Sequence, residues 1–405
     1  MSGGRSITAR PRWQRRQIVR LALIVLAALF LLWLSVAVSL AGAARERHPE
    51  LALRFWPIDG FAKAAKASLM ITADVRKEEV AQARQLALDA LRSEPMAVKG
   101  VRVAAIGAEV AGDRAAAKRQ FQLSRDLSKR DLITTLWFLE EAVSRNDIPG
   151  VLRQYEIALR TSRSSQGILF PVLDGALGDD ELVSSIGGLL ARGHEWVPPF
   201  AEYMIKDGKQ PGGFAKALLA RPTSLNHLPP DYRAALLTKL VDKGELNVAE
   251  RLYLRLSGSA PAAAIRNGDF SSPSVWPPFD WSLISGADYG ADLAPEQGAL
   301  LIYSRNGGAG TVARQILALA PGAYQLEVAG AVRSESGEGS ALWSVGCIGG
   351  RSLGGIRVGA QGRRLAQRIT VPAGCPRQWI NLEIGSGGEG SRIDGEFDSI
   401  RLRRI

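Results

Sequence analysis

The chain has 405 residues, a net charge of +11, 46% hydrophobic residues and 22% charged residues. This length allows two or three domains beside a membrane segment. Residues 1–49 carry eight arginines and one acidic residue, whereas residues 260–405 carry fourteen arginines against thirteen acidic residues. Because the positive charge is concentrated in a short tail and not on a domain face, we expect no nucleic-acid partner.

The N-terminal segment predicts a membrane anchor. Residues 21–44 form an uncharged apolar run that spans roughly 36 Å as a helix, enough to cross the roughly 30 Å hydrocarbon core of a bilayer. Residues 1–20 before it carry six arginines and no acidic residue. The positive-inside rule therefore predicts a cytoplasmic basic tail over 1–20, a transmembrane helix over 21–44 and a periplasmic bulk, as in a single-pass protein of the bacterial inner membrane.

Two other interpretations of this segment stay open. The small residues 41–43 suit a cleavage site, in which case the run is a signal peptide, although it is longer than the usual signal core. Alternatively, the run is a buried helix of a soluble protein. Fractionation with and without detergent separates the three interpretations, and the first two both put the remaining chain outside the cytosol.

Residues 50–256 show the apolar spacing of helices, interrupted by proline and glycine. Within them a pattern recurs at fixed offsets: a turn, a small residue that permits close helix packing, and an aromatic residue one helical turn later. It is clearest at Gly112-Asp113, Ala117 and Phe121, at Asn146-Asp147, Val151 and Tyr155, and at Gly244-Glu245, Ala249 and Tyr253. Weaker copies start at Glu78, Gly178 and Gln210.

This pattern resembles tetratricopeptide-type repeats (TPR), which have a 34-residue period and paired antiparallel helices. The likeness is best over residues 78–160, where Pro95 matches the family's repeat-ending proline, but the family's Trp-Leu-Gly-Tyr pattern is absent. The resemblance implies an all-α, TPR-like domain over 50–256 whose concave groove binds a protein partner. The alternative is a helical spacer that only supports the last domain.

Residue usage changes near residue 260. All eleven lysines lie between Lys63 and Lys243, whereas 24 of the 43 glycines lie in residues 260–405. A middle rich in alanine, leucine and lysine suits helices, and a glycine-rich end suits strands and turns. We therefore expect a linker at 257–261 and a separate domain over 262–405.

The C-terminal domain alternates apolar and polar residues. Residues 323–328, 379–384 and 399–403 each place apolar side chains on one face and polar side chains on the other. This alternation is typical of antiparallel strands with one buried face. About seven or eight such strands over 262–405 predict an all-β sandwich.

Three loose motifs frame this domain: Asn267-Gly268-Asp269-Phe270 with the aromatic residues after it, the segment 319–326, and the closing segment 397–402. Together they resemble the jelly-roll carbohydrate-binding modules and the related galactose-binding-like sandwiches. The resemblance implies a jelly roll that binds polysaccharide. It also implies a structural calcium ion between the first and last strands, with Asp269 and Asp398 as the matching ligands.

Aromatic side chains are the candidate glycan-binding residues, because sugar C–H faces stack on rings while sugar hydroxyls pair with amides and carboxylates. Trp379 shares the polar face of its strand with Asn381 and Glu383, which makes it the best platform, with edge packing as the alternative. Trp276 and Trp281 lie in a proline-rich segment and belong either to the site or to the core.

Cys347 and Cys375 are the only two cysteines of the chain. An oxidising compartment outside the cytosol would let them pair, and the bridge would contribute on the order of 3–4 kcal/mol. Two unrelated buried thiols are the alternative. The sequence contains no CxxC motif and no metal-ligand spacing among its three histidines.

Catalytic motifs of the GxSxG, HExxH and P-loop types are absent from the sequence, and no histidine follows His227. We therefore expect no enzyme. The leading hypothesis is a membrane-anchored periplasmic scaffold or accessory protein with a glycan-binding sandwich, acting in cell-envelope or exopolysaccharide biosynthesis or export. The alternatives are an envelope protein-interaction factor that binds no glycan, and a carbohydrate-active enzyme.

Overall fold

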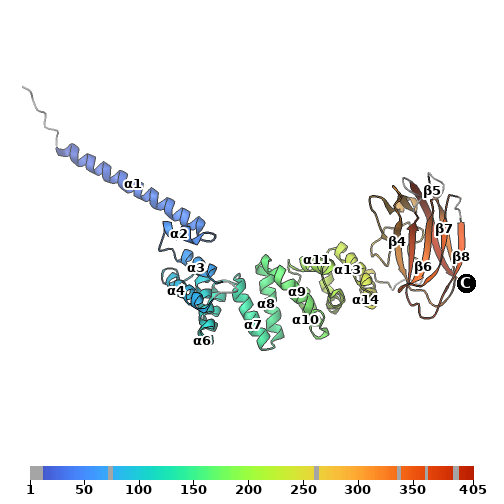
Figure 1. Cartoon of the computed structure of the whole chain (residues 1–405), viewed down its shortest axis with the longest axis horizontal. Coiled ribbons are helices and arrows are strands. Elements are labelled where there is room, and N and C mark those ends of the chain that lie inside the picture. The colour runs from blue at the N-terminus through green and yellow to red at the C-terminus, as the bar shows by residue number, and fades with distance from the viewer. Residues whose placement is uncertain (1–11, 72–75, 260–263, 335–338, 361–363, 386–391) are drawn as a thin grey trace, which may run out of the picture. The chain divides into compact units, whose positions relative to one another are not determined.

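A computed structural model of the chain describes residues 12–71, 76–259, 264–334, 339–360, 364–385 and 392–405 (Figure 1). Residues 1–11 of the predicted tail and 260–261 of the predicted linker lie outside the described residues. The described chain has one long N-terminal helix, thirteen further α-helices and a C-terminal sandwich of two sheets, which confirms the predicted fold class. It divides into two compact units, Met1–Ser165 and Gln166–Ile405, so the predicted helical domain of 50–256 contributes to both.

Helix α1, Arg12–Ala44, covers the predicted transmembrane segment. Its apolar stretch, Gln17–Ala44, has 28 residues and is long enough to cross a membrane, although a signal sequence meets the same criterion. Large apolar side chains are exposed along most of its length. So much exposed apolar surface favours an apolar surrounding, which a bilayer provides.

The described part of the first unit continues with seven helices: α2 (Pro49–Phe55), α3 (Gly60–Leu69), α4 (Lys77–Ser93), α5 (Val98–Val110), α6 (Arg114–Leu127), α7 (Leu132–Ser144) and α8 (Ile148–Thr161). Aspartate side chains cap α3, α6, α7 and α8 by accepting hydrogen bonds from backbone N–H groups of the first turn. Buried alanines line the contacts among α3, α4 and α5, so these helices approach one another closely.

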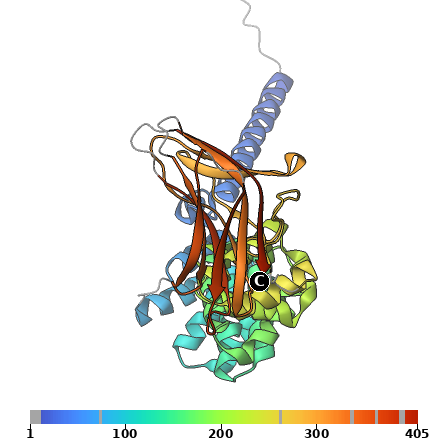
Figure 2. The ribbon, with the colours of Figure 1, turned by 90° about the vertical axis from the view of Figure 1, so that its right-hand side faces the viewer.

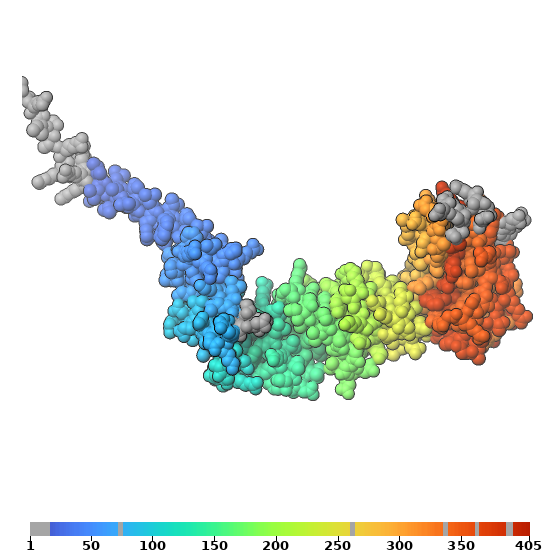
Figure 3. Space-filling model, in the orientation of Figure 1, coloured from blue at the N-terminus to red at the C-terminus, as the bar shows by residue number. Residues whose placement is uncertain are grey.

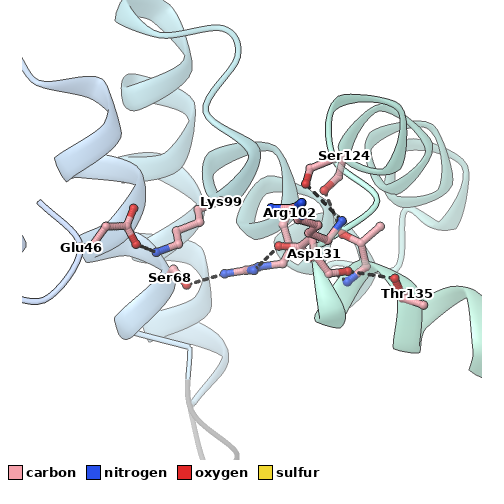
Figure 4. Close-up of polar contacts among 10 residues, drawn as sticks. Glu46, Ser68, Lys99, Arg102, Ser124, Asp131 and Thr135 are labelled. Atoms are coloured by element: carbon pink, nitrogen blue, oxygen red, sulfur yellow. Dashed lines mark hydrogen bonds and ion pairs between the residues drawn. The ribbon is translucent and has the colours of Figure 1, made fainter. Parts of the chain in front are cut away.

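A buried ion pair connects three of these helices (Figure 4). Arg102 of α5 pairs with Asp131, the N-cap of α7, and their side chains are only 8% and 7% exposed. The same guanidinium donates a hydrogen bond to the Ser68 hydroxyl on α3, and Asp131 accepts one from the Thr134 backbone N–H at 2.9 Å. A charge at this depth requires a partner of opposite sign, so each residue depends on the other.

The second unit begins with six described helices: α9 (Gln166–Ala176), α10 (Asp180–Leu190), α11 (Val197–Lys206), α12 (Pro211–Ala220), α13 (Pro230–Asp242) and α14 (Leu246–Ser257). Aromatic side chains fill their contacts. Phe200 packs against Phe170 and Phe214, with ring centroids 5.1 and 5.6 Å apart.

The recurring sequence pattern marks a recurring helix start. Gly112, Asn146 and Gly244 adopt positive φ angles of 83°, 54° and 78°. Each directly precedes the N-cap residue of the next helix, α6, α8 or α14. The aromatic residue of each copy is buried: Phe121, Tyr155 and Tyr253. The pattern therefore encodes a tight turn followed by a helix with an inward-facing aromatic residue, while membership of the TPR family stays a prediction.

The C-terminal part is a sandwich of two antiparallel sheets, and Figure 2 shows its strands lengthwise. Sheet A has the order β1-β4-β9-β6-β7, and sheet B has the order β2-β3-β10-β5-β8. The strands of sheet A are β1 (Ser282–Leu283), β4 (Gly310–Leu317), β6 (Ala341–Cys347), β7 (Ser352–Val358) and β9 (Gln378–Ile384). Those of sheet B are β2 (Tyr289–Ala294), β3 (Ala299–Ser304), β5 (Gly322–Ser334), β8 (Arg364–Val371) and β10 (Ile393–Arg404).

One hydrophobic core lies between the two sheets. The alternation read from the sequence is confirmed along β5, where Tyr324, Leu326 and Val328 are buried. The predicted disulfide is also confirmed. It joins Cys347, at the end of β6, to Cys375, in the segment before β9, with Cα atoms 5.5 Å apart.

Helices α13 and α14 contact the sandwich within the second unit. Tyr253 of α14 stacks on Phe279 with ring centroids 4.5 Å apart, and both rings are buried. Asp242, the last residue of α13, pairs with Arg314 of β4 at 3.2 Å. The sequence predicts a linker and a domain boundary here, whereas the structure adds packed side-chain contacts across that boundary.

Candidate functional site

The outer face of sheet B is hollowed over β3, β5 and β10 and at the start of β8. This hollow, which we call the sheet B trough, has a volume of about 710 Å³. It is lined by Leu301, Ile302, Ala329, Gly330, Ala331, Arg333, Arg364, Asp394, Gly395, Glu396, Asp398 and Ser399. The lining residues lie on the outer face of the sheet, so in the described part of the chain the trough faces outward from the sandwich.

The trough is hollow because small residues occupy its floor. Ala329 and Ala331 take the outward positions in the middle of β5. Gly330 between them lets β10 approach, since a Cβ atom there would lie 2.5 Å from the carbonyl oxygen of Glu396. Asp398 is the extra residue of a bulge in the β5–β10 ladder, and such a bulge redirects the strand at this point.

Charged side chains of both signs surround this floor. The exposed ones are Asp394, Glu396 and Asp398 of β10, Arg333 of β5 and Arg364 of β8. Asp394 stands directly opposite Arg333 in the strand ladder. Carboxylates accept hydrogen bonds and guanidinium groups donate them, so the trough offers both kinds of partner to a ligand rich in hydroxyl groups.

A second hollow of about 320 Å³ adjoins the trough and shares Ala329, Arg364 and Ser399 with it. It adds the arginines Arg401 and Arg403 of β10. The polar surface therefore continues along β5 and β10 beyond the trough, which suits an extended ligand better than a single small molecule.

The three residues of the platform predicted on β9 lie on the same side of the strand, as expected. Trp379, Asn381 and Glu383 share one face of the central strand of sheet A, and the residues between them are buried. The Trp379 ring, however, has the Arg314 guanidinium over it, 4.7 Å from the ring centroid. The same arginine pairs with Asp242 of α13. The Trp379 ring therefore lies beside the junction of helix and sandwich, and the part of Trp379, Asn381 and Glu383 in glycan binding stays a prediction.

The two tryptophans predicted from the proline-rich segment differ in environment. Trp281 is 1% exposed, donates its indole N–H to the Asn267 carbonyl at 3.0 Å and packs against Trp343. The assignment of Trp281 as a glycan-binding residue is wrong, because the core encloses its ring. Trp276 is half-buried in a turn, where its backbone N–H donates to Asp280 at 2.8 Å, and it stays a candidate.

The segments of Asp269 and Asp398 are neighbours, because the Ile400 backbone N–H donates to the Gly268 carbonyl at 2.7 Å. The Asp269 carboxylate accepts a hydrogen bond from the Ser271 hydroxyl at 3.1 Å. Among the described residues, no group of three or more His, Cys, Asp or Glu side chains is placed to hold a metal ion. Calcium takes about six to eight oxygen ligands, which include backbone carbonyls as well as carboxylates, so the calcium site at Asp269 and Asp398 stays a prediction.

The trough carries no aromatic platform among its lining residues, so the usual sequence sign of a glycan site does not mark it. A different signal is present: Ala329-Gly330-Ala331 and Asp394-Gly395-Glu396 put small or charged residues at the outward positions of two strands. The two segments form one hollow only because β5 pairs with β10. These strands are far apart in the sequence, so local periodicity does not show that they are neighbours.

No family model and no curated protein matches this chain. Among solved structures, a CBM4 carbohydrate-binding module is 17% identical, covers 35% of this chain and 99% of its own, and has a TM-score of 0.27. The TmCBM61 module in complex with β-1,4-galactotriose is 16% identical, covers 35% and 97%, and has a TM-score of 0.26. The apo CBM1 module of BiXyn10A is 14% identical, covers 34% and 95%, and has a TM-score of 0.25. At these values the likeness concerns the fold of the β-sandwich alone.

Proposed function

We propose that this protein binds a glycan in the sheet B trough and holds it outside the cytosol, at the membrane in which α1 is anchored. The observation that carries the proposal is an open trough with a small apolar floor and a surround of carboxylates and guanidinium groups. A sugar chain presents apolar C–H groups together with many hydroxyls. Binding sites that combine apolar surface with a few placed polar groups suit such a ligand.

The protein binds glycan without hydrolysing it in this proposal. Glycoside hydrolysis uses two carboxyl groups about 5–10 Å apart that flank the scissile bond. In the trough, Asp394, Glu396 and Asp398 all lie along β10, while β5 beside it and β8 beyond β5 contribute arginines. A row of carboxylates on one strand does not enclose a bond from two sides.

Binding of the full-length protein, reconstituted in nanodiscs, to an array of bacterial envelope polysaccharides tests this proposal. For the best ligand, Glu396→Gln and Arg364→Ala should each weaken the affinity by about tenfold, equal to about 1.4 kcal/mol and typical of a lost charged hydrogen bond. Arg368→Ala is the matched control, because it changes an exposed arginine of the same strand outside both hollows. An unchanged affinity in both trough variants, or hydrolysis of the ligand, would contradict the proposal.

Trp379→Ala separates the two faces of the sandwich. If the trough is the site, this variant should bind as the unchanged protein does. If sheet A is the site, Trp379→Ala should abolish binding and the trough variants should have no effect.

The proposed location is the bacterial inner membrane, with a cytoplasmic N-terminus and a periplasmic bulk. The apolar length of α1, the arginines before it and the bond between Cys347 and Cys375 support this location, because disulfides persist in oxidising compartments. We propose an accessory role there in cell-envelope or exopolysaccharide biosynthesis or export. A reporter fused after Ile405 should be active only outside the cytosol, and the mature chain should resist carbonate extraction; release would indicate a cleaved signal peptide.

A second candidate function is the binding of a protein partner by the helical part. A hollow of about 400 Å³ between α4 and α5 has apolar Val80 and Val110 beside basic Arg84, which suits an amphipathic segment with acidic residues. A photo-crosslinking residue at Gln85, in this hollow, should capture a partner in intact cells. The same probe at exposed Leu123 on α6 is the control, and equal capture at both positions would contradict a specific groove.

A further inference from the structure

We infer that the corner formed by α2 and the start of α3 lies on the membrane surface and embeds four apolar side chains among the lipid headgroups. This juxtamembrane corner consists of residues 45–61. The inference rests on the proposed anchoring of α1 and adds a second, distinct contact with the same bilayer. Its partner is the lipid surface on the side where α1 ends.

The position of the corner follows from the length of α1. The 28 residues of Gln17–Ala44 span roughly 42 Å as a helix, more than the roughly 30 Å of a hydrocarbon core. The last turns of α1 therefore reach the headgroup region. There Ala41 packs in one cluster with Ala52 of α2 and Ala62 of α3, which keeps the corner at that depth. Figure 3 shows the chain that follows α1, in lighter blue, gathered at its C-terminal end.

Four large apolar side chains of the corner are exposed. Leu51, Phe55 and Ile58 follow one another at steps of four and three residues and are 46%, 45% and 65% exposed, and Phe61 is 36% exposed. Ala52, on the inward side of α2, is fully buried. In water such a cluster of large apolar side chains is unfavourable, whereas at a bilayer boundary it is the usual composition of an interfacial segment.

Two exposed arginines of the corner, Arg47 and Arg54, suit anionic headgroups. Its three acidic residues have partners within the unit. Glu46 pairs with Lys99 of α5 (Figure 4), Glu50 with Lys66 of α3 at 3.4 Å, and Asp59 accepts a hydrogen bond from the Ala62 backbone N–H at 3.0 Å. Arg47 and Arg54 are exposed and line a hollow of about 460 Å³ beside Leu51, together with the paired Glu50 and Lys66. Cations next to exposed apolar side chains suit the boundary between phosphate groups and acyl chains.

The test uses the full chain reconstituted in vesicles of phosphatidylcholine with phosphatidylglycerol that contain nitroxide-labelled lipid. Ile58→Cys carries an environment-sensitive fluorophore, while the native cysteines are bonded to each other and do not react. Val143→Cys on α7, which is 59% exposed against 65% for Ile58, is the matched control. We expect the label at residue 58 to be blue-shifted and quenched several-fold more strongly than the label at residue 143.

The role of the cations is tested in the same vesicles. Arg47→Gln together with Arg54→Gln should reduce quenching at residue 58, and replacing phosphatidylglycerol by phosphatidylcholine should have the same effect. Quenching that responds to neither change would overturn the headgroup contact.

Carbonate extraction separates this inference from the anchoring on which it rests. A chain that stays in the membrane while the label at residue 58 is as water-exposed as the label at residue 143 overturns the corner alone. A chain released by carbonate overturns the anchoring, and the inference with it. Glycan binding by the trough is measured independently and does not bear on either outcome.

Discussion

Glu250 on α14 accepts two hydrogen bonds from the guanidinium of Arg377, which lies immediately before β9. One of them, from Arg377 Nη2 to Glu250 Oε2, is 2.6 Å long. Hydrogen bonding to this carboxylate raises the pKa of Arg377 above its ordinary value. The pair links the last helix to the strand that carries Trp379, so we expect helices and sandwich of the second unit to unfold together.

Removal of the charge at residue 250 tests this link. Glu250→Gln should lower the free energy of unfolding by about 2 kcal/mol, because it replaces a charge-assisted, partly buried hydrogen-bond acceptor. Urea unfolding followed by tryptophan fluorescence measures the change. Glu296→Gln, in an exposed turn, is the control. Equal urea midpoints for the two variants would show that the pair does not stabilise the junction.

The buried pair of Arg102 and Asp131 predicts a larger effect. Asp131→Asn should lower the free energy of unfolding of the first unit by about 3–5 kcal/mol, because Arg102 would keep its charge in a buried position without a counter-charge. Hydrogen exchange in α5 and α7 reports the local effect. Glu141→Gln, which breaks a more exposed pair with Lys118, is the comparison and should cost under about 1 kcal/mol. If both substitutions lowered the free energy of unfolding by a similar amount, burial would not explain the contribution of the Arg102–Asp131 pair.

Loss of the disulfide should destabilise the sandwich. Cys347→Ser with Cys375→Ser should cost about 3–4 kcal/mol in the free energy of unfolding, because the bond limits the freedom of the unfolded chain. Urea unfolding measures it, and dithiothreitol added to the unchanged protein should give the same loss. An unfolding midpoint that is insensitive to both changes would contradict the prediction.

The pair of Lys63 and Asp89 predicts a pH dependence in the first unit. The Lys63 ammonium donates to the Asp89 carboxylate at 2.7 Å and lowers its pKa below the ordinary value of about 3.9. Because the pKa of Asp89 is lower in the folded state than in the unfolded state, the pair stabilises the fold at pH values above the unfolded-state pKa. This stabilisation is lost as the pH falls through the folded-state pKa. Carboxyl NMR titration should show the pKa of Asp89 rising toward its ordinary value in Lys63→Met. The pKa of Asp89 should stay unchanged in Lys66→Met. A pKa that changes in Lys66→Met but not in Lys63→Met would contradict the role given to Lys63.

Several features could be predicted from the sequence because each depends on a local pattern. An uncharged run over 21–44 required one long helix, and alternation over 323–328 and 379–384 required strands with one buried face. Two cysteines in one domain left a single possible pairing. The recurring turn, small residue and aromatic residue fixed the helix starts, since a positive φ and an N-cap are encoded within a few residues.

Tertiary structure alone decided which of these faces is open. The alternation of buried and exposed residues predicted that Trp379 lies on the outer face of its strand. The Arg314 guanidinium over its ring comes from a strand about 65 residues earlier, which the local sequence does not reveal. Trp281 reads as a surface candidate until both sheets close over it. The trough arises only where β5 and β10 pair. Periodicity determines the side of an element on which a residue lies, whereas exposure depends on distant segments that cover that side or leave it free.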